Sequence, residues 1–207
     1  MSVFSDVDIA NLSLDRLGVE PITDLSDNNS RAELMNRLYL PQLNSLLVET
    51  VWNFAMGRVQ LTDTGIAPAF EYSNQYQLPT DFLKVHRIFD SNPGTSTGNK
   101  HPYDFPGGQV YFEIESDKLL GNFEECFIVY VKAVTDVTKF SPDFVEAFYL
   151  RLAAAASYKL TQDKTLKDSL ISEAEFYVRR AAAISAQQDY AEDDTLFFGS
   201  YIYPRST

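Results

Sequence analysis

The chain has 207 residues, 45% of them hydrophobic and 22% charged, so it is long enough for one domain with a buried core and too apolar for a disordered segment. Its 17 basic and 29 acidic side chains give a formal net charge of −12, which removes the electrostatic attraction on which non-specific nucleic-acid binding depends. The single cysteine, Cys126, excludes an internal disulfide and a cysteine-based zinc site, and it favours a reducing compartment.

The chain shows no sign of export or of membrane insertion. The N-terminus lacks a basic region followed by an apolar stretch, and no apolar run approaches the roughly 20 residues that a membrane span needs. We therefore expect a soluble protein with no membrane partner. The negative charge would suit a surface past which DNA slides without sticking, although any acidic soluble protein would carry it too.

Two helices are predicted at the start of the chain. Ser5 is a candidate N-cap and Gly18 a candidate stop for the first helix, and Ser30 with Glu33 forms a capping-box pattern that opens the second. Pro41 predicts a kink or break in the second helix, because an interior proline costs about 3 kcal/mol in a straight helix. The apolar positions that define the two helices are Val7, Ala10, Leu14, Leu17, Leu34, Leu38, Leu46 and Leu47.

Strands follow, because the apolar period changes to two. The segment from Ser91 to Gly108 is rich in Gly, Pro, Ser, Thr and Asn, and it predicts a long loop between strands. Phe112 and Ile114 alternate with acidic residues, a pattern typical of a half-buried strand with one solvent face. The alternating apolar positions are Val59, Leu61, Tyr76, Leu78, Val110, Phe112, Ile114, Phe127, Val129 and Val131.

The helical period returns at Ser141-Pro142, a probable N-cap with proline at the first helical position. Two long helices joined by a turn near Asp163 should pack as an antiparallel hairpin. Alanines 153–156 and 181–183 would permit close helix packing, within the chain or between neighbouring copies. The apolar stripes are Val145, Tyr149, Leu152, Ala156 and Leu160, then Leu166, Leu170, Ala174, Tyr177, Ala181 and Ile184.

No residue pattern argues for an enzyme, a metal site or a cofactor. His86 and His101 have no catalytic motif around them, and His86 and Cys126 are interpreted as structural strand residues. Glu113 and Glu115 share one face of a strand and could serve a glycosidase-like site, but the solvent face of a strand has the same appearance. Phosphate loops, two-histidine zinc spacings and calcium loops are absent from the sequence.

The chain ends in an acidic stretch followed by an aromatic segment. From Asp189 to Thr207 there are 19 residues, which reach at most about 60 Å when extended. Exposed aromatic side chains are an aggregation liability, so this arm should pack on its own domain, on a neighbouring copy or on another protein. The candidate contact residues of this arm are Leu196, Phe197, Phe198, Tyr201, Ile202 and Tyr203.

These patterns together predict an α+β fold in four parts. Residues 1–56 hold the N-terminal helices of a helical bundle, and residues 57–135 form a mainly antiparallel β-rich insertion. Residues 140–188 form a C-terminal helical hairpin that completes the bundle, and residues 189–207 form an extended arm.

The order of these features resembles the tail tubular protein A or tail accessory factor family, the head-to-tail adaptors of short-tailed phages. Trp-Asn-Phe-Ala at residues 52–55 and Leu-Pro-Thr-Asp at residues 78–81 are the most recognisable motifs. The resemblance covers roughly the first 90 residues and rests on Ala10, Leu14, Leu17, Gly18, Ile22, Leu25, Ala32, Trp52, Phe54, Ala55, Tyr76, Leu78, Pro79, Asp81, Leu83 and Val85.

The resemblance implies a structural connector in the virion, at the head-to-tail junction, assembled in the host cytoplasm. Its partners would be the portal protein ring, neighbouring adaptor subunits in a dodecameric ring and a downstream tail or nozzle protein. DNA would pass through the channel without specific binding, along acidic residues of the wall. Two alternatives remain at this point: a tail-associated peptidoglycan hydrolase that uses Glu113 and Glu115, and a host helical scaffold protein.

Overall fold

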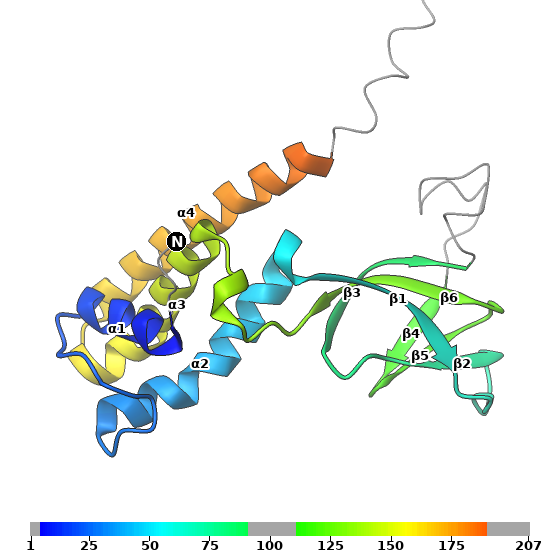
Figure 1. Cartoon of the computed structure of the whole chain (residues 1–207), viewed down its shortest axis with the longest axis horizontal. Helices are drawn as coiled ribbons and strands as arrows, with labels where there is room; N and C mark the ends of the chain where they lie inside the picture. The colour runs from blue at the N-terminus through cyan, green and yellow to red at the C-terminus, as the bar shows by residue number, and fades with distance from the viewer. Residues whose placement is uncertain (1–4, 91–110, 190–207) are drawn as a thin grey trace, which may run out of the picture.

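A computed structural model of the chain describes residues 5–90 and 111–189, without the side chains of residues 185–189. It has two parts that lie side by side (Figure 1). The helical lobe consists of four helices, α1 to α4, and the sheet lobe consists of six strands, β1 to β6. The α+β class predicted from the sequence is therefore confirmed.

Helix α1 spans Asp6–Arg16 and begins as its sequence predicts. The Ser5 hydroxyl accepts a hydrogen bond from the backbone N–H of Asp8 at 3.1 Å, and the Asp8 carboxylate accepts one from the backbone N–H of Ser5 at 2.8 Å. These bonds lower the pKa of Asp8 below its ordinary value, the backbone bond from Ser5 most. Gly18 follows the helix with φ +66°, a conformation that favours glycine.

Helix α2 spans Ser30–Glu49, and it differs from its prediction in its N-cap and in having no break at Pro41. The N-cap is Asn29 and not Ser30, because the Asn29 carboxamide oxygen accepts from the N–H groups of Arg31 and Ala32. The helix also continues unbroken through Pro41. Pro41 is exposed and its neighbours on the opposite face are buried, so tertiary packing outweighs the local cost of the proline.

Helices α3 (Pro142–Thr161) and α4 (Lys164–Asp189) pack together as the predicted antiparallel hairpin. Gln162, with φ +59°, occupies the left-handed region in the tight turn between them. Ala153, Ala154 and Ala156 are buried against the other helices of the same chain, as the intrachain interpretation of the alanines requires. Helix α4 has 26 residues against 20 in α3, so its last turns extend past the start of α3 (Figure 1).

The four helices share one hydrophobic core with the segment that leads into the sheet. Trp52, which is 2% exposed, packs edge to face on Phe144 with ring centroids 4.8 Å apart. Its indole N–H donates to the backbone carbonyl of Leu46 at 2.9 Å, in the last turn of α2. A single turn of 3₁₀ helix, η1 (Asn53–Ala55), then leads to β1, so Trp-Asn-Phe-Ala connects the two lobes.

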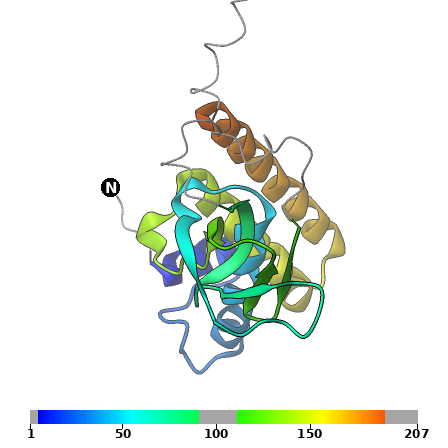
Figure 2. The same cartoon turned by 90° about the vertical axis from the view of Figure 1, so that its right-hand side faces the viewer.

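The sheet is antiparallel with strand order β3-β6-β1-β2-β5-β4 and curls into a half-barrel (Figure 2). A second core lies inside it, around Tyr76, Leu119, Cys126 and Ile128. A second 3₁₀ turn, η2 (Val137–Lys139), leads from the sheet to α3. The strands are β1 (Met56–Asp63), β2 (Asn74–Gln77), β3 (Phe82–Phe89), β4 (Phe112–Glu115), β5 (Lys118–Gly121) and β6 (Cys126–Lys132).

The half-buried character predicted for the strand around Phe112 and Ile114 is wrong. All four residues of β4 are exposed, because β4 is the edge of the sheet and pairs only with β5. The predicted loop from Ser91 to Gly108 and the arm after Asp189 lie outside the described residues.

Candidate functional site

Two arginines are brought together on the outer face of the sheet by strand register. Arg58 on β1 is paired with Val129 on β6, and Val129 is paired on its other side with Arg87 on β3. Residues in one cross-strand row point to the same face, and strands lie about 4.8 Å apart. The two arginine backbones are therefore about 10 Å apart, with only Val129 between them.

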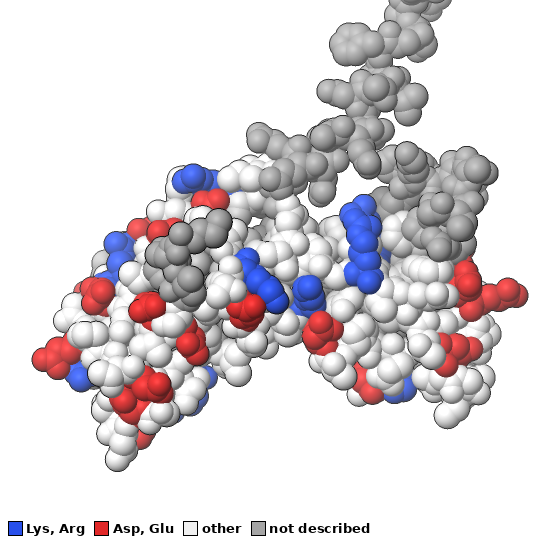
Figure 3. Space-filling view, viewed as in Figure 1, with Lys and Arg blue, Asp and Glu red and all other residues white. Residues whose placement is uncertain are grey.

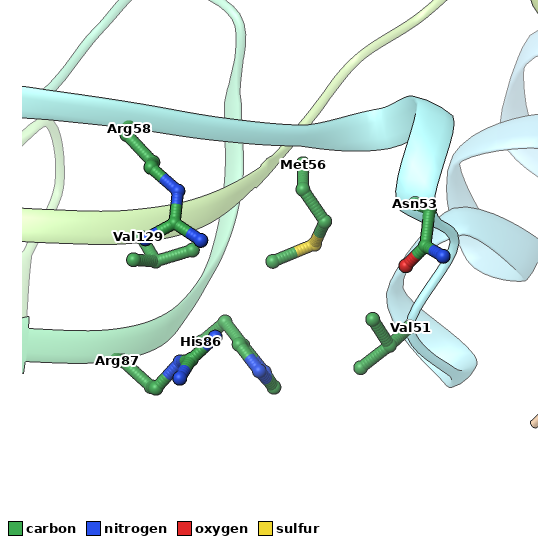
Figure 4. A pocket seen from close by; sticks show the side chains of 7 residues that line it. All are labelled: Val51, Asn53, Met56, Arg58, His86, Arg87 and Val129. Atoms are coloured by element: carbon green, nitrogen blue, oxygen red, sulfur yellow. The ribbon is translucent and has the colours of Figure 1, made fainter. Parts of the chain in front are cut away.

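A β-bulge brings a third basic side chain to this row. The step from Tyr130 to Val129 on β6 corresponds to a step from Val85 to Arg87 on β3, which makes His86 the additional residue of the bulge. Bulges redirect side chains, and His86 and Arg87 both line the same pocket as Arg58 (Figure 4).

The pocket, which we call the arginine pocket, has a volume of about 300 Å³ and lies where the two lobes meet. Val129, which is 3% exposed, forms part of its floor. The segment between α2 and β1 supplies its other wall (Figure 4). The lining residues are Val51, Asn53, Met56, Arg58, His86, Arg87 and Val129.

The guanidinium groups of Arg58 and Arg87 pair with no carboxylate among the described residues. The Nε atom of Arg87 is buried and has no hydrogen-bond partner among the residues that the structure describes. Five other arginines of the described chain do lie within 4.0 Å of a carboxylate: Arg16, Arg31, Arg151, Arg179 and Arg180. Within the described part of the chain, the arginine pocket therefore brings together two arginines without a paired carboxylate, in a protein whose net charge is −12.

Charge is also unevenly distributed over the surface as a whole. On the face that Figure 3 shows, the larger basic groups lie near the middle of the molecule, where the two lobes meet, and acidic side chains spread toward both ends. The long-range field of the acidic ends attracts cations and repels anions, so an anionic group needs specific donors to bind here. Arginine is suited to this role because its planar fork binds a carboxylate or phosphate through two hydrogen bonds.

A second hollow of about 300 Å³, the apolar hollow, lies beside the projecting end of α4. Ile184 lines it and is 41% exposed, because this part of α4 has run past the start of α3. Asn53 lines both hollows, so they lie on either side of the connecting segment. The residues around the apolar hollow are Trp52, Asn53, Phe54, Ser141, Asp143, Ala181 and Ile184.

The candidate residues of the sequence analysis do not converge on one site. Glu113 and Glu115 are exposed on the edge strand β4 and line neither of these hollows. Cys126 is fully buried, and this burial raises the pKa of its thiol to about 12. Within residues 5–90 and 111–189, no group of three or more His, Cys, Asp or Glu side chains is placed to hold a metal ion.

The six arm residues from Leu196 to Tyr203 and His101 lie outside the described residues. Arg58 and Arg87 were not among the candidate residues that the sequence patterns indicated. They are 29 positions apart, and only the pairing of β1 and β3 with the same central strand brings them into one row. An available signal was the adjacent basic pair His86-Arg87 in a strand whose other residues, apart from Lys84, are apolar.

Comparison with known proteins adds no assignment. No family model matches the chain, and no curated protein does so either. The helices in the described part of the chain all fall short of the length and apolar character that crossing a membrane requires.

Proposed function

We propose that this chain is a non-enzymatic structural subunit, a head-to-tail connector that forms a ring on a phage portal and extends its DNA channel toward the tail. The observation that carries the proposal is the projecting end of α4 with the apolar hollow at its base. There Ile184 is 41% exposed beside Trp52 and Phe54. An apolar surface of this kind at the end of a helix favours coverage by another subunit.

In this proposal the four helices act as the bundle that forms the ring, dodecameric by analogy with the resembling family. The segment after α4 is the arm, and Leu196, Phe197, Phe198, Tyr201, Ile202 and Tyr203 bind the portal or the adjacent subunit. The other face of the ring receives a downstream tail or nozzle protein. The assembled ring belongs to the virion, and its subunits are made in the host cytoplasm.

The acidic surface has a role in the same proposal. A channel wall of net negative charge repels the DNA backbone, so DNA passes through without the phosphate contacts that would hold it. The arginine pocket is a local exception, and it therefore belongs at a contact between proteins and not on the channel wall.

The test is binding to a portal ring. The mass of the full chain is measured alone and mixed with a candidate portal, together with a variant that ends at Ala191. We expect a complex whose mass corresponds to one copy of the chain per portal subunit, and we expect the shortened variant to keep its circular dichroism spectrum but not to bind. Binding of the shortened variant at wild-type strength would refute the role of the arm, and failure of the full chain to bind would refute the connector.

A second measurement separates the connector from the hydrolase. The full chain is added to purified cell walls and turbidity is followed, with Glu113→Gln and Glu115→Gln as matched variants. The proposal requires that turbidity does not fall with any of the three proteins. A fall that depends on either carboxylate would contradict the non-enzymatic assignment.

A further inference from the structure

The arginine pocket has the chemistry of a carboxylate site. Two guanidinium groups, one of them with a buried and unbonded Nε atom, stand on either side of the small apolar side chain of Val129. A buried donor without a partner costs about 1–3 kcal/mol, so an acceptor that binds Arg87 in this pocket removes that penalty. Like charges across one row also repel, and an anion between them removes that repulsion.

The chain itself contains a segment that fits this site. Glu192, Asp193 and Asp194 are three consecutive carboxylates that begin three residues after the end of α4, and the sequence has 18 residues after Asp189. In an extended chain, residues two apart point to the same side about 7 Å from each other. Glu192 and Asp194 would then present two carboxylates at a spacing that two long arginine side chains, rooted about 10 Å apart, can reach.

The direction of α4 favours a neighbouring copy over the chain's own pocket. Its last turns run past the start of α3 and point away from the helical lobe (Figure 1), so the helix ends pointing away from the body of its own subunit. Glu192 and Asp194 lie three and five residues after the end of α4, so an extended chain can carry their backbones about 10 and 17 Å from Asp189, onto a subunit packed against this end of the helix.

We propose that the arginine pocket, through Arg58 and Arg87, binds the carboxylates of Glu192 and Asp194 from a neighbouring copy of this chain. The proposal rests on the proposed function only in that a ring places copies side by side. It assigns the acidic residues a docking role separate from that of the aromatic residues, with the aromatic arm continuing from this anchor.

Nucleic acid is the less suitable occupant. The pocket is small, and the protein around it has a net charge of −12, which opposes the approach of a polyanion far more than that of three carboxylates. The charges of a short acidic segment fit within the pocket, whereas a duplex would also meet the acidic residues of both lobes.

The test uses the full-length chain and a fluorescent peptide with the sequence of residues 189–207, and binding is measured by anisotropy at low salt. We expect the double variant Arg58→Ala/Arg87→Ala to weaken binding at least tenfold. The variant Arg58→Ala, at an exposed position, should weaken it in the same direction and guards against misfolding of the double variant. The control Lys159→Ala/Lys164→Ala removes the same charge at the opposite end of the α3–α4 hairpin and should leave binding unchanged.

Changes in the peptide give the reciprocal test. A peptide with Glu192→Gln, Asp193→Asn and Asp194→Asn should bind at least tenfold more weakly than the natural peptide. A peptide with lysine at these three positions should bind the protein variant Arg58→Glu/Arg87→Glu better than it binds the wild type. Because partly exposed ion pairs are screened, binding of the natural peptide should weaken as salt is raised.

Several results would overturn the proposal. These are equal binding to every variant, or no binding of the natural peptide to the wild-type chain. Binding that appears only after the protein's own three acidic residues are neutralised would show that each chain fills its own pocket. Loss of binding to a short DNA duplex, but not to the peptide, in the Arg58→Ala/Arg87→Ala variant would assign the pocket to nucleic acid. No portal is present in this assay, so its outcome is independent of whether the chain joins a portal.

Discussion

Replacing Trp52 by phenylalanine tests whether the connecting segment stabilises the helical core. Trp52 is 2% exposed, and its indole N–H donates to the Leu46 carbonyl at 2.9 Å. Phenylalanine cannot donate this bond, so a buried carbonyl loses its partner at a cost of about 1–3 kcal/mol. The missing ring atoms next to Phe144 leave a cavity that costs about 1 kcal/mol more. The free energy of unfolding should therefore fall by about 2–4 kcal/mol.

The assay is urea denaturation followed by far-ultraviolet circular dichroism, because Trp52 is the only tryptophan and its fluorescence disappears in the variant. For a chain of this length the same loss corresponds to a fall in Tm of about 4–16 °C. Phe176→Leu is the matched control, since Phe176 is 56% exposed and its replacement should change stability by less than about 0.5 kcal/mol. If Trp52→Phe costs no more than this control, the assignment of Trp52 as a core anchor is wrong.

Three further predictions concern the backbone and the sheet core. Pro41→Ala should raise the free energy of unfolding by about 1–2 kcal/mol, because an interior proline costs about 3 kcal/mol and its benefit in the unfolded chain offsets only about 1. An unchanged urea midpoint would contradict this. Gly57→Ala should lower stability by about 1–3 kcal/mol, since the new Cβ would lie 2.7 Å from a ring carbon of Tyr130. A variant as stable as the wild type in thermal unfolding would show that the ring moves freely. Burial raises the pKa of the Cys126 thiol to about 12, so a thiol reagent at about pH 8 should label the protein only after denaturation. Rapid labelling of the native chain would refute the burial of Cys126.

The start of α1 shows which structural details the sequence encodes locally. Ser5 and Gly18 were sufficient to predict where the helix begins and ends, because a cap involves residues a few positions apart. The same is true of the α3–α4 hairpin, where apolar stripes and a short turn determine an antiparallel pair.

Local patterns failed where a long-range contact competes with them. The sequence favoured Ser30 as a cap and a break at Pro41, but the chain selects Asn29 and keeps α2 continuous, since its apolar face packs on the core. Phe112 and Ile114 alternate like buried residues, yet β4 is the edge of the sheet and is exposed. The residues of a strand do not by themselves determine its position within a sheet.

The candidate site shows the same difference between local sequence patterns and long-range contacts. The sequence by itself determined the α+β class, the ends of α1 and the presence of an acidic and aromatic C-terminal segment, all of which depend on composition and on neighbours within a few residues. Only the tertiary structure decided that Arg58 and Arg87 share one pocket, because this depends on strand order and on the bulge at His86. Register is set by pairing between distant segments, and one residue of shift would have placed these arginines on opposite faces of the sheet.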